Sequence, residues 1–282
     1  MISDNITSHI EKKYGTITNI QTVGGGCIAD TYKISTTNQS LFIKCGNLPS
    51  DMLIKEGHGL QELALAKSIH IPKVIDVTED FLLLEYIEQG IRDTHFFAEF
   101  GASLANMHTY TSETCGFYED NYLGYSYQKN TLSTNWVDFY VNNRLFFQIE
   151  LMKQKNLECS ELERLLHSAE KNIRNVLSTG DSTFSLLHGD LWGGNYMITH
   201  NGKPCLIDPA VYYGNREADL AMTKLFGGFT AEFYEAYMKT YPLPAGYKKR
   251  EPLYTLYHIM NHYTLFGGGY YSHALSIIQK YL

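Results

Sequence analysis

The sequence predicts an α+β fold of two lobes: a small β-rich lobe at residues 1–87 and a larger, mainly α-helical lobe at residues 88–282. Short runs rich in β-branched and aromatic residues dominate the first part of the chain. Beyond Glu88, apolar residues recur at the three- and four-residue spacing of amphipathic helices. We therefore expect an antiparallel sheet with one helix in the small lobe, and a ligand site between the lobes.

The small lobe is expected to contain a short sheet that a single helix interrupts. Leu53, Leu60, Leu63 and Ala64 fall near one face of a helical run at residues 53–68. Runs suited to β-strands lie on both sides of this helix. The predicted strands are residues 17–23, 31–35, 41–45, 73–77 and 81–87.

The second lobe is expected to consist of helices, interrupted by one strand–loop–strand segment. The predicted helices are residues 96–109, 136–152, 157–177, 216–241 and 252–266. Pro242 and Pro244 separate the last two of these helices, because proline lacks the backbone N–H that a helix interior needs.

The interrupting segment begins with a buried strand at residues 184–187 and ends with a hairpin formed by residues 196–199 and 204–207. Asn201-Gly202 stands between the two strands of this hairpin. That dipeptide favours a two-residue turn of type I′. The hairpin would bring the residue before its first strand close to the residue after its second strand.

Three polar side chains frame this segment. Asp190 lies in a glycine-rich loop after the buried strand, Asn195 precedes the hairpin, and Asp208 follows it. Kinase-type phosphoryl transfer uses groups of these kinds. One carboxylate accepts the proton of an attacking hydroxyl, while an amide oxygen and a second carboxylate hold the Mg²⁺ that bridges the phosphates. Each residue alone also suits a surface hairpin, but the complete set favours phosphoryl transfer.

A glycine run in the small lobe could contact phosphate groups. Gly24, Gly25, Gly26 and Cys27 fall between two predicted strands, where glycines let the backbone fold over phosphates. A plain hairpin turn is the alternative, and the Gly-Lys-Ser/Thr ending of a Walker A motif is missing. Cys27 could be a redox-active thiol that links two chains, or simply a small residue in a tight turn.

A charged pair is predicted beside this glycine run. Strand alternation puts Lys44 on the same face as Phe42, where a phosphate would satisfy its charge. Glu56, early in the following helix, could orient that lysine. The alternatives are a lysine that protects a sheet edge and a solvated helix glutamate.

Residues Glu85, Tyr86 and Ile87 end the last strand of the small lobe and lead into the second lobe. Their backbone groups are placed to hydrogen-bond the edge of an adenine. A simple linker between the lobes would fit the same residues.

Composition excludes several classes of function. The net charge of −7 argues against general nucleic-acid binding, which needs a basic surface. No apolar run reaches the ~20 residues of a membrane span, and the first residues do not match a signal peptide. Five cysteines with scattered spacing indicate reduced thiols in the cytoplasm. No C-x-x-C pair suggests a zinc site.

The chain as a whole resembles the fructosamine kinases, also called ketosamine 3-kinases. These belong to the wider kinase-like group that includes aminoglycoside and choline kinases. The resemblance covers essentially the whole chain, including the glycine run of the small lobe. The motifs that carry it in the second lobe are residues 188–195, 207–210, 217–221, 225–229 and 265–270.

This resemblance implies a protein-kinase-like fold and a role for each polar residue. Asp190 would be the catalytic base, and Asn195 with Asp208 would hold Mg²⁺. Lys44 and Glu56 would position the phosphates of ATP. The segment after Asp208 lacks the length of an activation loop, so switching by phosphorylation there is not expected.

Four further residues receive roles from the resemblance and from their positions. His188 and Asp219 would support the catalytic loop. Trp192, which follows the base closely, could stack on a sugar or pack against the large lobe. His262 is expected to contact the substrate, although its helix face also suits a buried, hydrogen-bonded position.

The function implied is ATP-dependent phosphorylation of the 3-hydroxyl of a ketosamine, a sugar–amine adduct formed by glycation. The substrate would be a small molecule or a glycated protein, and the reaction would serve deglycation repair or salvage. One alternative is a kinase of an aminoglycoside or a choline-like amino-alcohol. Another is a nucleotide-binding regulatory protein without turnover. We expect a monomer or a weak, redox-linked homodimer.

Overall fold

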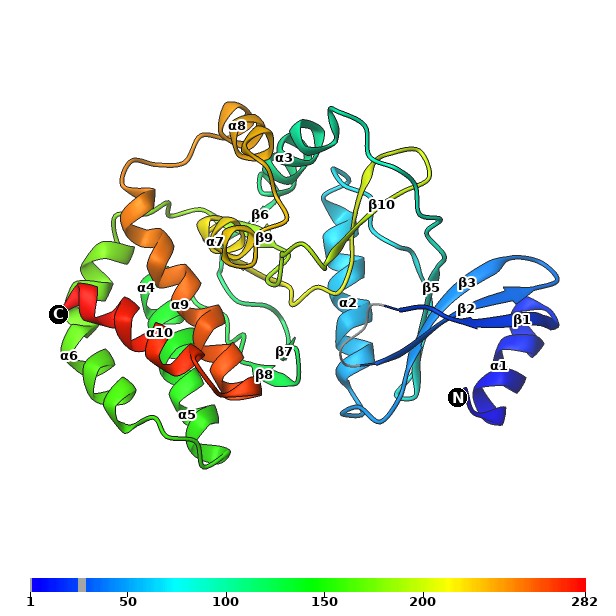
Figure 1. Ribbon diagram of the computed structural model, residues 1–282, viewed down its shortest axis with the longest axis horizontal. Coiled ribbons are helices and arrows are strands. Elements are labelled where there is room, and N and C mark those ends of the chain that lie inside the picture. The colour runs from blue at the N-terminus through cyan, green and yellow to red at the C-terminus, as the bar shows by residue number, and fades with distance from the viewer. Residues whose placement is uncertain (1, 25–28) are drawn as a thin grey trace.

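The computed structural model describes residues 2–24 and 29–282, and it has two parts (Figure 1). The first part contains a five-stranded sheet with the order β1-β2-β3-β5-β4, in which all neighbours are antiparallel. The second part is mainly helical. The strands of the sheet are β1 (Ile17–Thr22), β2 (Asp30–Thr36), β3 (Ser40–Cys45), β4 (Val74–Val77) and β5 (Phe81–Glu85). The predicted α+β, two-lobed fold is confirmed.

The two faces of the sheet are covered by different helices. In β5, Phe81 and Leu83 pack with α1 (Asp4–Tyr14), whereas Leu82 and Leu84 pack with α2 (Met52–Leu65). Side chains along a strand alternate between faces, so one apolar run can serve both helices. This is why β5 is apolar throughout instead of alternating with polar residues.

Within residues 2–24 and 29–87 the small lobe contains two helices, so the prediction of one helix was wrong. Helix α1 was missed because its sequence is polar overall and buries only Ile6 and Ile10. Ser3 caps its start by accepting the Ile6 N–H at 3.4 Å. At its other end, Lys13 pairs with Asp76 of β4 at 2.8 Å. Tertiary contacts therefore stabilise this helix more than its own apolar pattern does.

The helical part follows the predicted order with several corrections. Its helices are α3 (Phe96–Met107), α4 (Trp136–Tyr140), α5 (Phe147–Gln154), α6 (Ser160–Leu177), α7 (Glu217–Leu225), α8 (Ala231–Thr240), α9 (Tyr247–Phe266) and α10 (Tyr270–Ile278). A π-helical turn, Val141–Phe146, joins α4 to α5. Helix α10 and the short strands β6 (Thr111–Ser112), β7 (Asn121–Leu123), β8 (Ser126–Gln128) and β12 (Tyr212–Gly214) were not predicted.

Two predicted helix boundaries were wrong. The single helix expected at 216–241 is two helices, because Gly227 and Gly228 adopt φ values of 73° and 96° that break the helical path. The last long helix begins at Tyr247 instead of Pro252. Arg250 in its first turns is buried and pairs with Glu217 of α7 at 2.7 Å, which holds this extra turn in place.

The hairpin of β10 (Tyr196–Ile198) and β11 (Pro204–Leu206) forms as expected, but its turn is not of type I′. Type I′ needs positive φ at both central residues. Gly202 has a φ of 77°, whereas Asn201 is not in the positive region. The Gly202 N–H donates to Thr199 O at 2.8 Å, which makes a longer loop that ends on a left-handed glycine.

Helix α2 also packs against the second part of the molecule. A Cβ atom on Gly59 would lie 3.1 Å from Val211, and Leu63 belongs to the main core of the helical part. The Tyr213 hydroxyl donates to Glu62 at 2.6 Å. One helix of the small lobe is thus a shared structural element of both parts. None of the helices in residues 2–24 and 29–282 combines the length and apolar character needed to span a bilayer.

Candidate active site

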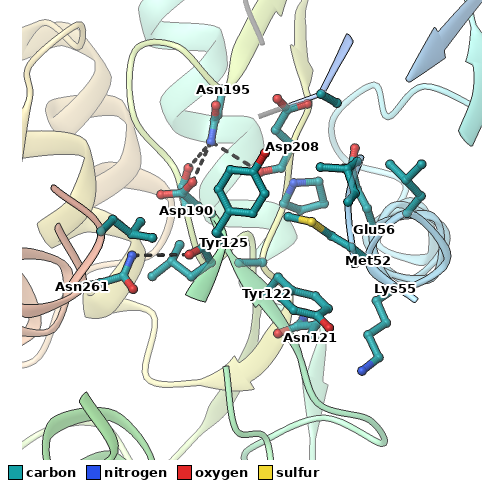
Figure 2. A pocket seen from close by; sticks show the side chains of 18 of the residues that line it. Met52, Lys55, Glu56, Asn121, Tyr122, Tyr125, Asp190, Asn195, Asp208 and Asn261 are labelled. Carbon is teal, nitrogen blue, oxygen red and sulfur yellow. Dashed lines mark hydrogen bonds between the residues drawn. The ribbon is translucent and has the colours of Figure 1, made fainter. Parts of the chain in front are cut away.

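The hairpin brings the predicted polar residues together (Figure 2). Asn195 directly precedes β10, Asp208 follows β11, and the Ile207 N–H donates to Asn195 O at 3.1 Å. The Asn195 amide nitrogen donates to Asp190 Oδ2 at 3.0 Å and to the Asp208 backbone oxygen at 3.4 Å. The Asn195 side chain therefore contacts both aspartates, and its amide oxygen is of the ligand type that Mg²⁺ takes.

Asp208 has an unusual backbone conformation, with a φ of 54°. Residues other than glycine rarely adopt this left-handed region, and such residues cluster at functional sites. The strain turns the chain sharply after β11. It allows the Asp208 side chain to reach Lys44 of the small lobe, with which it forms an ion pair.

Lys44 lies in β3 on the face covered by α2, and its ammonium is 2.7 Å from Glu56 Oε1. The side chain is buried, and burial by itself would lower its pKa. The carboxylates of Asp208 and Glu56 outweigh burial and hold the pKa of Lys44 above its ordinary value. A permanently charged ammonium is therefore fixed where the two parts of the molecule meet.

The carboxyl of Asp190 has a raised pKa. Burial raises the pKa of its carboxyl to about 7, and the nearby Asp208 and Asp219 act in the same direction against the hydrogen bond from Asn195. A base works best when its pKa lies near the working pH. The environment of Asp190 thus favours proton transfer.

Asp219 of α7 holds the loop that carries Asp190 through hydrogen bonds to its backbone. Its carboxylate accepts the His188 N–H at 2.7 Å and the Gly189 N–H at 2.9 Å. Gly189 has a φ of 81°, and a Cβ atom there would lie 2.0 Å from Ala210 O, so only glycine fits. The imidazole of His188 lies 2.9 Å from Ile207 O, beside the start of the Asp208 segment.

His108 supports this loop, and the sequence analysis did not find its role. Its Nε2 lies 3.2 Å from Asp219 Oδ2 and its Nδ1 lies 2.7 Å from the Tyr237 hydroxyl. Burial lowers the pKa of His108 despite the neighbouring carboxylate. The only sequence signal was its place on the apolar face of the helix that ends at Met107.

A cavity of about 290 Å³ opens at this point. Its lining includes two groups of residues. Lys44, Glu56, Asp190, Asn195 and Asp208 form a charged group, which we call the charged end. Trp192, Asn261, His262, Leu265 and Phe266 form a mostly apolar group, which we call the aromatic end. Tyr122 and Tyr125 line it as well, although nothing in the motifs pointed to them. The structure therefore places seven of the predicted site residues in one cavity: Lys44, Glu56, Asp190, Trp192, Asn195, Asp208 and His262.

Trp192 and His262 share the aromatic end of this cavity. The Trp192 ring lies over Gly194, where a Cβ atom would come within 2.4 Å of the indole. Phe226 contacts both residues, with ring centroids 6.2 Å from Trp192 and 4.7 Å from His262. His262 Nδ1 lies 2.8 Å from His258 O, and burial lowers the pKa of its imidazole. An uncharged, aromatic surface results.

Some predicted residues fall elsewhere. Glu85 ends β5, and the described residues lining the cavity do not include Glu85, Tyr86 or Ile87. Gly24 is described and exposed. Gly25, Gly26 and Cys27 lie outside the described residues, so the proposed phosphate loop and the redox role of Cys27 stay predictions.

The residues present fit a magnesium ion that is shared with phosphates. Mg²⁺ takes oxygen ligands and is commonly held by one or two carboxylates together with substrate phosphates and water. Asn195 and Asp208 offer an amide oxygen and a carboxylate at one edge of the cavity. In the described part of the chain, no cluster of three or more His, Cys, Asp or Glu side chains forms a separate metal cage.

Comparisons with known proteins identify relatives of this chain. The family model described as fructosamine kinase matches residues 1–282. A probable ketoamine kinase of Enterococcus faecium is 37% identical over 263 residues, covering 92% of this chain and 94% of its own. A chloroplastic protein-ribulosamine 3-kinase of Oryza sativa is 38% identical over 280 residues, covering 96% and 81%.

Solved structures extend the comparison. A candidate fructosamine-3-kinase of Haemophilus somnus superposes with a TM-score of 0.86 at 29% identity, over 98% of this chain and 96% of the other. The choline kinase LicA of Streptococcus pneumoniae gives 0.65 at 16% identity over 98% of each chain, which shows a common fold alone. The resemblance seen in the sequence is confirmed: the chain belongs to the fructosamine kinase family.

Proposed function

We propose that this protein transfers the γ-phosphoryl group of ATP to the 3-hydroxyl of a ketosamine. The observation that carries the proposal is the convergence of Asp190, Asn195, Asp208 and Lys44 in one cavity between the two parts of the molecule. Membership of the fructosamine kinase family supports the ketosamine as acceptor. The product would be a phosphorylated adduct that is prone to release its amine, which is a repair or salvage role.

In this proposal each residue has one task in the transfer. Asp190 accepts the proton of the attacking 3-hydroxyl as its oxygen bonds to the γ-phosphorus, and ADP leaves. Lys44, oriented by Glu56, contacts the α- and β-phosphates. Mg²⁺, when bound by Asn195 and Asp208, would neutralise charge on the phosphates. Asp219 and His188 keep the loop of Asp190 in position.

The remaining assignments concern the acceptor, the adenine, the location and the oligomeric state. Trp192 would stack on the sugar and His262 would contact the acceptor, since both line the aromatic end of the cavity. The backbone of residues 85–87 would hydrogen-bond adenine. A cytoplasmic location is supported by the free thiols of Cys45, Cys115, Cys159 and Cys205. The proposed oligomeric state is a monomer or a weak, redox-linked homodimer.

The test is ATP consumption with Mg²⁺ against a ribulosamine, a fructosamine, choline and kanamycin. Turnover of the ketosamines that disappears in Asp190→Ala is the expected result. Turnover of choline or kanamycin instead would keep the kinase chemistry and reject the sugar–amine acceptor. ATP binding without turnover of any acceptor would favour a regulatory protein and contradict the proposal.

A further inference from the structure

The hairpin of β7 and β8 contributes an aromatic side chain to the cavity from outside the family motifs. Gly124, with a φ of 61°, makes the turn, and Tyr125 follows it. Tyr125 lines the cavity together with Asp190 and Asp208 (Figure 2), and 47% of its surface is exposed. An aromatic ring of this size in a cavity that also contains carboxylates is a candidate contact for a ligand.

The base of this hairpin is anchored to the segment that follows Asp208. The Asn121 amide donates to Val211 O at 2.8 Å, and the Gln128 amide donates to Ala210 O at 3.0 Å. The Tyr257 hydroxyl of α9 donates to Gln128 Oε1 at 2.8 Å. Asn121 and Gln128 are both buried. Buried and satisfied hydrogen bonds of this kind fix the hairpin relative to the residues of the candidate active site.

The outer face of the hairpin is held by α2 of the small lobe. The Tyr122 hydroxyl donates to Asp51 at 2.7 Å, and Lys55 pairs with the same carboxylate at 2.7 Å. The Lys55 ammonium also lies 5.4 Å from the ring centroids of Tyr122 and Tyr127. The hairpin is therefore fixed on two sides, and Tyr125 is presented to the cavity from a rigid support.

The charges around Tyr125 favour a ligand that carries a cationic group. Both lysines that line the cavity are already paired, Lys44 with Glu56 and Asp208 and Lys55 with Asp51. The neighbouring Asp190 adds a further carboxylate. Aromatic faces attract cations, and a protonated amine next to a carboxylate and an aromatic ring is a common arrangement.

We propose that Tyr125 determines acceptor specificity by packing its ring against the sugar–amine part of the acceptor, as a second aromatic face besides Trp192. The inference rests on the proposed function and adds a residue to it. It predicts that Tyr125 discriminates acceptors that carry a protonated amine from otherwise similar sugars. The proposal assigns the acceptor contact to the face of the ring, so Tyr125→Phe is expected to retain it.

The experiment compares Tyr125→Ala, Tyr125→Phe and Tyr127→Ala in full-length enzyme, with a fructosamine and with free fructose as acceptors. Tyr127 is the matched control, because it lies on the same hairpin with its hydroxyl bonded to Asp120. We expect Tyr125→Ala to raise KM for the fructosamine about tenfold and to lower its preference over fructose, with KM for ATP within about twofold. Tyr125→Phe and Tyr127→Ala should stay within about threefold of wild type.

Several outcomes would overturn this inference. If Tyr125→Ala leaves KM for the fructosamine unchanged, the inference is wrong. If KM rises for ATP alone, the Tyr125 ring contacts the nucleotide and not the acceptor. An equal rise in KM for the fructosamine in Tyr127→Ala would show that Tyr125 acts by stabilising the hairpin and not by contacting the acceptor. If the wild-type enzyme turns over no ketosamine, both this inference and the proposed function are wrong. That outcome is seen in the wild type, whereas failure of this inference alone is seen only in the Tyr125 variants.

Discussion

The two ends of the cavity are stabilised in different ways. At the charged end, Lys44 pairs with both Glu56 and Asp208, and Asn195 is hydrogen-bonded to Asp190. At the aromatic end, Trp192 and His262 are positioned by ring contacts and by backbone packing. Charged groups that hold one another are preorganised for a ligand of fixed chemistry such as a nucleotide. An aromatic surface adapts to acceptors of different shape, so specificity is expected to reside at that end.

Removing the base should give the largest effect at the charged end. Asp190→Asn keeps the shape of the side chain but cannot accept the proton of the hydroxyl. We expect kcat to fall by about 10²–10⁴-fold, the usual contribution of general base catalysis. Steady-state kinetics with saturating ATP and acceptor would measure it, and a melting temperature near that of wild type would show an intact fold. A kcat within threefold of wild type would reject Asp190 as the base.

Lys44→Met should have the second largest effect, because it removes the cation of the ion-pair network at the charged end. Two carboxylates, Glu56 and Asp208, would then face each other without the ammonium between them. We expect a loss of about 3 kcal/mol of stability, measured by urea unfolding, and a marked rise in KM for ATP.

Lys55→Met is the matched control, since Lys55 also lines the cavity but pairs with the half-exposed Asp51. Its effect on stability should be about 1 kcal/mol or less. Equal losses in the two variants would show that the charged end is not specially organised around Lys44.

Trp192→Ala tests the aromatic end and should change activity less than the Asp190 and Lys44 variants. Loss of the indole face is expected to raise KM for the acceptor by about tenfold and to leave KM for ATP nearly unchanged. Trp192→Phe should recover most of the loss, since it keeps an aromatic face. A selective rise in KM for ATP would contradict the division of the cavity into two ends.

The smallest effect on activity is expected far from both ends, at Asp76 of β4. The hydrogen bonds from Lys13 and His9 outweigh burial and lower the pKa of Asp76 to about 2. A lowered carboxyl pKa means that the stabilisation is present above the unfolded value of ~3.9 and is lost as pH falls toward 2. Asp76→Asn should cost about 1 kcal/mol at neutral pH without changing kcat.

Acid unfolding curves would measure this effect. The difference in stability between wild type and Asp76→Asn should narrow between pH 4 and pH 2, where the wild-type carboxylate takes up its proton. A difference that is constant over this range would show that packing, and not the charge of Asp76, holds α1 on the sheet.

Elements with a strong local pattern were predicted well. The strands of the sheet and the hairpin around residues 196–207 form where alternation and turn residues indicated, so Asn195 and Asp208 meet as expected. Helix α1 was missed, because its stability depends on contacts with Asp76 that are distant in the chain. The break at Gly227 and Gly228 was also missed, although a pair of glycines is a local signal for a turn.

The residues of the candidate site also divide into those that local sequence patterns predict and those that depend on tertiary contacts. Asp190, Asn195, Asp208 and Lys44 could be found because motif spacing and strand alternation place them by local geometry. Tyr125 and His108 could not, because their roles depend on which helices and hairpins pack beside them. No spacing in the sequence predicts such contacts.

By itself, the sequence determined the fold class, the family and the polar groups of the charged end. These depend on local periodicity and on residues that lie near one another in the chain. Only the tertiary structure decided the pKa of Asp190, the charge of buried Lys44 and the makeup of the aromatic end. The physical reason is that burial and neighbouring charge are set by segments far apart in sequence, such as α2, the β7–β8 hairpin and α9, which meet only after folding.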